Sequence, residues 1–255
     1  MLNFFKIFIY RIYKKAKNKF KHVNKNRGYC NICEKETIFK EFKPWLRDNY
    51  KCINCLTKPR NRALINALNK FCPEWRSLTI HESSPDTGVS RFIQRNSSHY
   101  SASYYYEDIA RGEYKGEFRS EDLSALTFAD NSFDVFITSD VFEHIMNPCD
   151  AFREIARVLK PGGVHVFTMP WYPSIKQSVQ RAKLEEGKIV YLKEPVYHAN
   201  PISDKGSLVT YDWGLDFVDI IYEYCGLTTT IYLEKNRNLG LDGEFLEVFI
   251  SRKKH

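Results

Sequence analysis

From residue 75 onward, short apolar runs alternate with segments whose apolar residues recur at helical spacing. Residues 78–82 and 100–106 are predicted strands, and a helix over 89–94 is expected to join them. The runs over 133–138 and 164–169 are almost continuously apolar, as expected of strands covered on both faces of a sheet. Strands that alternate with helices in this way form βαβ units. The pattern predicts an α/β fold on a mostly parallel sheet.

The best-marked helix follows the strand over 133–138. Asn147 is its candidate N-cap, Pro148 suits its first position, and Asp150 lies near its positive end. Its apolar face is expected to contain Phe152, Ile155, Ala156 and Leu159. The helix should end before the turn over 161–163, since Pro and Gly stop helices.

The C-terminal part of the chain predicts one helix and two strands. The helix is expected around 217–224, and the strands over 227–233 and 245–251. A loop containing Gly240 and Gly243 joins the two strands. We therefore expect an antiparallel hairpin at the edge of the sheet.

The positive charge belongs to an N-terminal arm. The 255 residues include 38 Lys and Arg against 31 Asp and Glu, a formal net charge of +7. Residues 1–27 contribute +9 of this and no acid, so the rest of the chain is slightly acidic. The apolar stretch over 2–13 is too short and too charged to span a bilayer, which takes about 20 apolar residues. A peripheral amphipathic helix on an anionic membrane and a solvated or frayed basic terminus are both open.

Four of the seven cysteines form two knuckles, Cys30-x-x-Cys33 and Cys52-x-x-Cys55. Two such knuckles complete a tetrahedral site of four thiolates, which favours zinc. Disulfides or free thiols are the alternatives, and disulfides fit poorly because nothing marks the chain as secreted. Four protein ligands leave no open position, so the zinc would be structural. We expect a zinc module over 28–60 in a cytoplasmic protein, with peripheral membrane contact through 1–27 left open.

Three further motifs follow in a fixed order. The first, over 121–134, holds an acid, a Leu-Thr-Phe turn and Asn-Ser-Phe-Asp; the second is Ser-Asp-Val-Phe-Glu-His-Ile over 139–145; the third is Arg-Val-Leu-Lys-Pro-Gly-Gly over 157–163. Together they resemble class I S-adenosylmethionine-dependent methyltransferases, particularly the type 11 group. The resemblance covers roughly residues 75–235. It implies a Rossmann-like methyltransferase sheet over 61–255 and methyl transfer from S-adenosylmethionine.

The resemblance also implies a cofactor site. Its expected residues are Glu82, Ser84, Gly88, Asp122, Leu123 and Ser139. In the family, an acid at the end of the first strand and a Gly-x-Gly-x-Gly loop hold the methionine part of the cofactor. Glu82 and Gly88 match this pattern, whereas Ser84 and Asp86 stand where glycines are usual, and Asp86 would repel a carboxylate. Asp122 matches the acid that accepts a bond from the adenine amine.

A second departure concerns the ribose of the cofactor. An acid is expected near the end of the second strand, where the sequence has Tyr104; Glu107 and Asp108 just beyond are candidate substitutes.

The candidates for handling the methyl acceptor are His144 and Asp140, with His198 as a second candidate base and Glu143 less favoured. Residues 170–173 are expected to wall the acceptor pocket, and residues 197–201 to form a loop over it.

The acceptor itself stays open, with a sugar or glycan hydroxyl or a small metabolite favoured. Some bacterial proteins of similar organisation are associated with glycan assembly, which is an analogy of fold only. The alternatives are a non-catalytic methyltransferase-like binding protein, and an RNA-binding or RNA-modifying protein that uses the zinc module and the basic arm. Nucleic acid is the less favoured partner because the body of the chain is slightly acidic. A nicotinamide enzyme is disfavoured because no Gly-x-Gly-x-x-Gly follows a strand.

Overall fold

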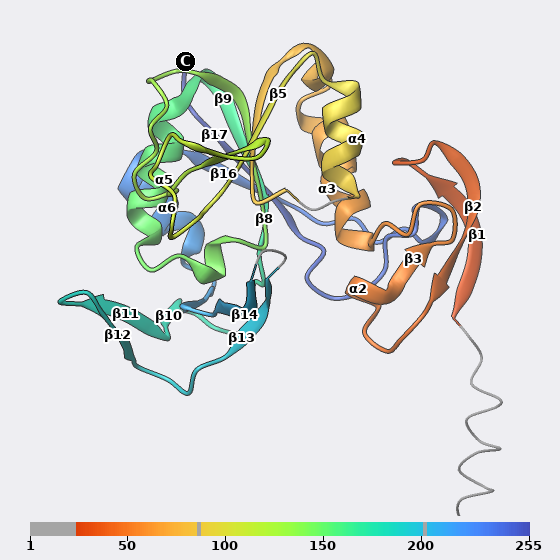
Figure 1. The fold of residues 1–255 in the computed structure, drawn as a ribbon. Helices are drawn as coiled ribbons and strands as arrows, with labels where there is room; N and C mark the ends of the chain where they lie inside the picture. The colour runs from red at the N-terminus through yellow and green to blue at the C-terminus, as the bar shows by residue number, and fades with distance from the viewer. Residues whose placement is uncertain (1–23, 86–87, 201–202) are drawn as a thin grey trace, which may run out of the picture.

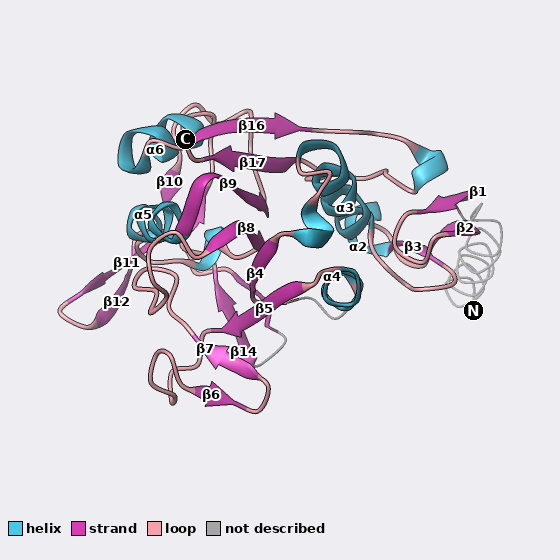
Figure 2. Cartoon of the chain, turned by 90° about the horizontal axis from the view of Figure 1, so that it is seen from above, coloured by secondary structure: helices cyan, strands magenta, loops and turns pink. Residues whose placement is uncertain are grey.

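An eight-stranded sheet forms the centre of the molecule. The structure, a computed structural model, describes residues 24–85, 88–200 and 203–255. The strand order of this sheet is β16-β17-β9-β8-β4-β5-β7-β6. Figures 1 and 2 show the strands from two directions. The four central strands are parallel: β4 (Thr79–Ser83), β5 (His99–Tyr104), β8 (Phe133–Ser139) and β9 (Leu159–Thr168). Their carboxyl ends therefore meet at one edge, where α/β folds place their ligands.

Antiparallel strands complete the sheet at both sides. β17 (Val248–Arg252) pairs with β9, and β16 (Thr228–Tyr232) pairs with β17 at the edge. This confirms the expected C-terminal hairpin, whose connection contains the short helix η3 (Arg237–Leu239). On the other side, β7 (Phe118–Ser120) is parallel to β5, and β6 (Tyr114–Lys115) is antiparallel to β7.

Two helices cover each face of the sheet. α3 (Pro59–Phe71) and α4 (Val89–Asn96) lie on one face, and α5 (Pro148–Val158) and α6 (Phe217–Cys225) lie on the other (Figure 1). Side chains of β8 alternate between the two: Val135 and Ile137 belong to the first hydrophobic cluster, and Phe136 belongs to the second. Such alternation follows from the two-residue period of a strand.

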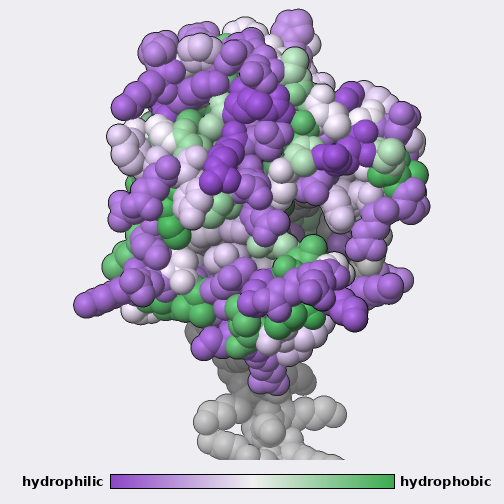
Figure 3. All heavy atoms as spheres, turned by 90° about the vertical axis from the view of Figure 1, so that its left-hand side faces the viewer, coloured by the Kyte–Doolittle hydropathy of each residue, from purple (hydrophilic) through white to green (hydrophobic). Residues whose placement is uncertain are grey.

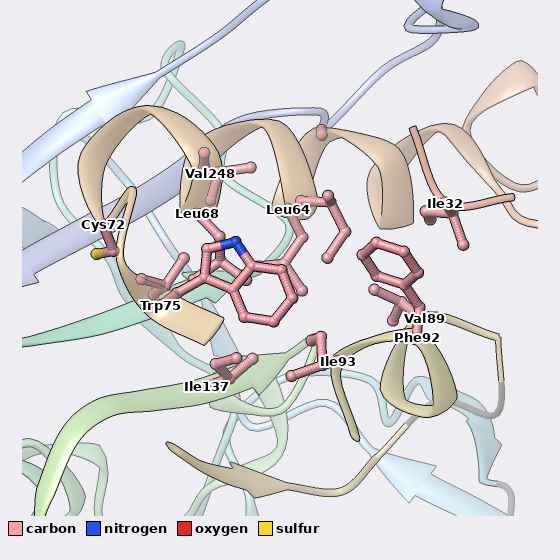
Figure 4. Packing of buried hydrophobic residues seen from close by; sticks show 14 of the residues in the cluster. Ile32, Leu64, Leu68, Cys72, Trp75, Val89, Phe92, Ile93, Ile137 and Val248 are labelled. Carbon is pink, nitrogen blue, oxygen red and sulfur yellow. The ribbon is translucent and has the colours of Figure 1, made fainter. Parts of the chain in front are cut away.

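Trp75, in the short helix η1 (Trp75–Ser77), is fully buried in the first cluster. Figure 4 shows its indole between Leu64 and Leu68 of α3 on one side and Ile93 and Ile137 on the other.

The helix α5 differs from its prediction in its N-cap and in its last residue. It begins at Pro148 as expected, but the Asn147 side chain makes no capping hydrogen bond. It ends at Val158, because Leu159 has an extended backbone (φ −71°, ψ 136°) and is the first residue of β9. The Pro-Gly-Gly turn at 161–163 is thus contained within the long strand β9 instead of preceding it.

The cysteine-containing segment forms a small antiparallel sheet of β1 (Lys25–Cys30), β2 (Lys35–Glu41) and β3 (Tyr50–Cys52), with the short helix α2 (Leu46–Asn49) before β3. Arg62 of α3 anchors it, since its fully buried guanidinium donates to the carbonyls of Tyr50 (2.8 Å) and Gly240 (2.6 Å). Gly240 is required there: its φ is +67°, and a Cβ would lie 2.5 Å from the Phe39 ring. The segment thus packs on both α3 and the C-terminal hairpin connection. Its division from the domain at residue 60 stays a prediction, and most of the 1–27 arm lies outside the described residues.

An insert between β9 and α6 consists of three antiparallel strand pairs. They are β10 (Val179–Gln180) with β15 (Tyr211–Asp212), β11 (Ala182–Glu185) with β12 (Lys188–Tyr191), and β13 (Tyr197–Asn200) with β14 (Ser203–Leu208). The prediction of a loop over 197–201 is therefore wrong for residues 197–200, because β14 supplies hydrogen-bonding partners that the local sequence does not reveal. Figure 3 shows apolar side chains gathered low on this face of the molecule. Leu184, Ile189 and Leu192 of the insert are exposed apolar residues. Among the described residues, no helix has the length and hydropathy needed to cross a bilayer.

Candidate functional site

The loop after β4 begins with a residue in a conformation that favours glycine. Ser84 has a φ of +57°, in the left-handed region that glycine adopts freely and other residues adopt at a cost. Its N–H donates to the Ser103 carbonyl (2.8 Å). Gly88 caps α4 and packs closely, since a Cβ there would lie 3.2 Å from the Thr57 methyl group. Asp86 lies outside the described residues.

Glu82, the expected acid of the first strand, is fully buried within the protein. Its carboxylate accepts hydrogen bonds from the Ser90 hydroxyl (2.9 Å) and the Tyr100 hydroxyl (2.6 Å). The carboxylate thus ties α4 and β5 to β4, and it stabilises the start of the loop that follows.

Tyr104 takes the place of the expected ribose-binding acid, and it supports the same loop. Its buried hydroxyl donates to the Pro85 carbonyl (2.8 Å), and its ring meets Phe118 edge to face at 4.9 Å. The two candidate substitutes, Glu107 and Asp108, are exposed, and Asp108 pairs with Lys115 at 3.0 Å.

Asp122 and Leu123 follow β7 at the same edge of the sheet. The half-buried Asp122 accepts a bond from the Ser124 N–H (2.8 Å), which fixes the orientation of its carboxylate, and Leu123 is buried. Ser139 is half-buried at the end of β8. Apart from the buried Glu82, the expected cofactor residues therefore lie around the carboxyl ends of β4, β7 and β8.

Asp140 is held by two arginines from distant parts of the chain. Arg47 of α2 binds both carboxylate oxygens through Nη2 (2.7 and 2.8 Å), and Arg60 of α3 binds Oδ2. The Thr168 hydroxyl donates to Oδ1 (3.0 Å). Although burial acts the other way, the two guanidinium groups hold the pKa of Asp140 well below its usual range. Asp140 thus links the cysteine-containing segment to the edge of the sheet, as an ionised and fully bonded group.

Glu143 and His144 of the short helix η2 (Phe142–His144) meet His198 of β13. Glu143 Oε1 lies 3.7 Å from His144 Nε2 and 3.9 Å from His198 Nδ1. The ring centroids of the two histidines are 5.0 Å apart, at 90°. The insert positions this trio, because His144 Nδ1 hydrogen bonds to the Leu208 carbonyl (2.8 Å) and the Thr210 N–H donates to the Glu143 carbonyl (2.7 Å). In Figure 1, β13 and β14 accordingly lie beside the lower end of β8.

Burial dominates the protonation of the three groups. It raises the pKa of Glu143 well above 4.5, and the negative charge of Asp140 adds to this effect. It lowers the pKa of His144 and of His198 from 6.5. All three shifts favour the uncharged forms. A carboxyl group beside two neutral imidazoles can exchange a proton with a bound molecule.

A cavity of about 140 Å³ opens beside this trio. Glu143 and His198 line it together with Tyr172, Tyr211, Arg181 and Asp212. Tyr172 and Pro170 line the cavity, whereas the half-buried Trp171 packs on Phe217 and Phe249 of the core. A larger cavity, about 280 Å³, lies at the opposite edge of the sheet, between Cys72 and the turn at 161–163. It shares no lining residue with the cavity beside the trio.

The four predicted cysteine ligands come together in the N-terminal segment. Cys30 Sγ lies 3.7 Å from Cys55 Sγ, and Cys33 Sγ lies 3.8 Å from Cys52 Sγ. All four sulfurs are within 4.8 Å of one another, and none forms a disulfide. A tetrahedron of Zn–S bonds of about 2.3 Å has sulfur–sulfur edges of about 3.8 Å, so the donor set fits zinc.

The sequence did not predict Arg47, Arg60 or Arg181 at this site, and it ranked Glu143 below His144 and Asp140. A lone arginine carries no motif, so the sequence held no signal for the first three. Glu143 did carry a signal, because it stands three residues after Asp140 and next to His144.

Comparison with known proteins identifies the domain. Residues 89–167 match the family model Methyltransf_11, described as a methyltransferase domain. The match begins directly after the unusual loop and contains β5, β8, α5 and most of β9. The chain therefore contains a methyltransferase domain, as the sequence motifs predicted. No curated protein matches the chain.

Solved structures of methyltransferases share the fold. An S-adenosylmethionine-bound amino pentose methyltransferase from Micromonospora echinaspora is 14% identical, with a TM-score of 0.50, over 78% of this chain and 92% of that one. An S-adenosylmethionine-dependent methyltransferase from Mesorhizobium loti is 17% identical, with a TM-score of 0.49, over 75% of this chain and 98% of that one. At such identities, the likeness to the first of these shows the Rossmann-like methyltransferase fold and nothing finer.

Proposed function

We propose that this methyltransferase uses S-adenosylmethionine to methylate a hydroxylated small molecule or glycan. The observation that carries the proposal is the trio of Glu143, His144 and His198 beside a polar, aromatic-lined cavity. It stands at the carboxyl edge of the sheet in a chain with a methyltransferase domain.

The residues around β4, β7 and β8 suit a cofactor with an adenosine and an amino-acid part. Ser84 supplies the turned backbone that glycine supplies elsewhere in the family, and Asp122 offers an oriented carboxylate for an adenine amine. Leu123 offers an apolar surface for the adenine, and Gly88 begins the helix α4, whose first N–H groups face this loop. Bound S-adenosylmethionine supplies an electrophilic methyl group, and the protein has only to hold it in line with the acceptor.

The lining of the cavity favours a hydroxylated acceptor. Tyr172 and Tyr211 provide aromatic surface, and Asp212 provides a carboxylate paired with Arg181 Nη1 at 2.7 Å. Arg181 Nε is buried without a hydrogen-bond partner among the described residues. An acceptor oxygen would satisfy this donor. Aromatic faces with a few convergent polar groups are typical of sites that bind ring-shaped polar ligands.

Methyl transfer is a single displacement in this scheme. An acceptor oxygen forms a bond to the methyl carbon while the carbon–sulfur bond breaks and its electron pair stays on sulfur. The acceptor proton passes to His198, whose pKa is lowered by burial and whose ring reaches the cavity. Asp140, fully paired with Arg47 and Arg60, acts as a positioning residue for η2.

We also propose that Cys30, Cys33, Cys52 and Cys55 hold a structural zinc ion. The sulfur separations support it. In this arrangement zinc fixes the segment that delivers Arg47 to Asp140, so the metal acts on the site through position and not through chemistry.

The test of the activity is transfer of radiolabelled methyl groups from S-adenosylmethionine into a small-molecule extract and a glycan extract. The wild-type protein should label a product in at least one extract, and His198→Ala should label it far more slowly. Arg95→Ala, on the far end of α4, is the matched control and should leave the rate unchanged. Absence of label in both extracts would contradict the proposed acceptor class.

A further inference from the structure

The Glu143 carboxyl group is buried with nothing in hydrogen-bond reach. It is 1% exposed, and neither of its oxygens has a hydrogen-bond partner among the described residues. A buried polar group destabilises the folded protein when it is left without a hydrogen-bond partner. A buried carboxyl retained at this cost, at the wall of a cavity, points to a bound species that completes it.

The two neighbouring histidines each bring a ring nitrogen within 4 Å of Glu143 Oε1, at 3.7 Å for His144 and 3.9 Å for His198. His144 Nδ1 hydrogen bonds to the Leu208 carbonyl, which only accepts, so Nδ1 carries the proton and Nε2 carries the lone pair. Nε2 is the atom that faces Glu143 Oε1. A backbone carbonyl on the remote nitrogen is the arrangement that orients metal-bound histidines. His198 Nδ1 faces the same oxygen from β13.

We propose that Glu143, His144 and His198 bind a divalent transition-metal ion at the wall of the acceptor cavity. The ion displaces the proton of the buried Glu143 carboxyl, and the resulting carboxylate oxygen and two imidazole nitrogens form a donor set that suits Mn²⁺, Co²⁺ or Zn²⁺. The three donor atoms lie within 4.8 Å of one another. Bonds of about 2.1 Å require donor separations of about 3.0–3.4 Å, so the exposed His198 side chain has to move inward by about 1 Å.

Three protein ligands leave coordination positions open, unlike the four cysteines of the other site. Open positions are typical of ions that contact a substrate. Because the trio lines the cavity, the open positions face the acceptor. This use of the ion rests on the proposed function, whereas the binding of the ion does not.

With the ion bound, His198 is a ligand, so proton transfer to His198 applies only to the metal-free protein. The ion withdraws electron density from the acceptor oxygen and lowers the pKa of its hydroxyl. The proton leaves to solvent, the oxygen forms the bond to the methyl carbon, and sulfur keeps the electron pair of the bond that breaks. The site then selects acceptors with an oxygen donor at the reacting position, such as sugar hydroxyls.

Manganese is the direct probe, because Mn²⁺ prefers nitrogen and oxygen ligands and leaves thiolates to zinc. Full-length protein carrying one equivalent of zinc is titrated with Mn²⁺, and the loss of the free-ion electron paramagnetic resonance signal gives the bound fraction. We expect one Mn²⁺ per chain in the wild type. Glu143→Gln and His198→Asn should weaken binding at least tenfold. His99→Asn, at an exposed position on β5, is the matched control and should bind as the wild type does.

Two results would overturn the inference: no Mn²⁺ binding up to millimolar ion, or equal affinity in the wild type and His198→Asn. Circular dichroism of each variant excludes unfolding as the cause of lost binding. Calorimetry with S-adenosylmethionine in the presence of a chelator tests cofactor binding separately. A protein that binds the cofactor but no Mn²⁺ would refute the metal site alone, and one that binds Mn²⁺ but no cofactor would refute the proposed function alone.

Discussion

His165 is a buried histidine that should make the folded protein less stable as the pH falls. It lies in β9, is fully buried, and stacks on Phe167 at 4.3 Å. Nε2 is hydrogen-bonded to the Thr138 hydroxyl (3.0 Å), and Nδ1 has no hydrogen-bond partner among the described residues. Burial lowers the pKa of His165 to about 3. The folded protein therefore keeps this imidazole neutral throughout the mildly acidic range.

The size of the stability loss in acid follows from the difference between the pKa of His165 in the folded protein and its pKa in the unfolded chain. The unfolded chain takes up the proton at a pKa of 6.5, whereas the folded protein resists it until about pH 3. Stability is therefore complete above pH 6.5 and falls progressively between pH 6.5 and 3. Each pH unit is worth about 1.36 kcal/mol, so the wild type should lose about 2 kcal/mol to His165 alone between pH 7 and 5.

The assay compares urea unfolding of the wild type, His165→Phe and His99→Phe at pH 7 and pH 5. His165→Phe loses the bond to Thr138 at both pH values, so its constant offset cancels in the comparison. Its free energy of unfolding should fall about 2 kcal/mol less on acidification than that of the wild type. His99→Phe, at an exposed site, should behave as the wild type. Equal losses in wild type and His165→Phe would refute the assignment of a buried neutral imidazole.

Three further changes test other parts of the structure. Asp140→Asn removes the carboxylate that binds Arg47 and Arg60 most closely and leaves them only the longer ion pairs with Asp48, so the free energy of unfolding in urea should fall by about 3 kcal/mol; a change below 1 kcal/mol would contradict the pairing. Cys30→Ser should abolish zinc binding, measured by elemental analysis, whereas Cys225→Ser on α6 should keep one zinc per chain. Ser84→Gly relieves a left-handed φ and should raise the unfolding free energy by up to about 1 kcal/mol; a loss of stability would contradict that strain.

Periodicity predicted six of the eight strands of the sheet. Most residues of β8, β9 and β17 are buried, so their apolar runs were visible in the sequence. β6 and β7 were not predicted because they are only two and three residues long. The insert escaped prediction because its strands are short and solvent-exposed. In β13, Tyr197, His198 and Ala199 are all exposed, so no apolar pattern distinguishes this strand from a loop.

The site was predictable only where its residues are close in sequence. The spacing of the four cysteines predicted their cluster, and the position of His144 after β8 indicated that it lies at the ligand-binding edge of the sheet. The partners of Asp140 lie 93 and 80 residues away along the chain, in Arg47 and Arg60. Nothing local marks either arginine, since the ion pairs form only when α2 and α3 reach the edge of the sheet.

The central claim is that this chain binds S-adenosylmethionine despite its unusual loop after β4, and calorimetric titration tests it most directly. We predict one S-adenosylmethionine per chain, with weaker binding in Asp122→Ala. Asp219→Ala, on α6 away from this edge, is the matched control and should bind as the wild type does. No detectable heat with the wild type at millimolar cofactor would contradict the account and leave a methyltransferase fold that has lost its cofactor.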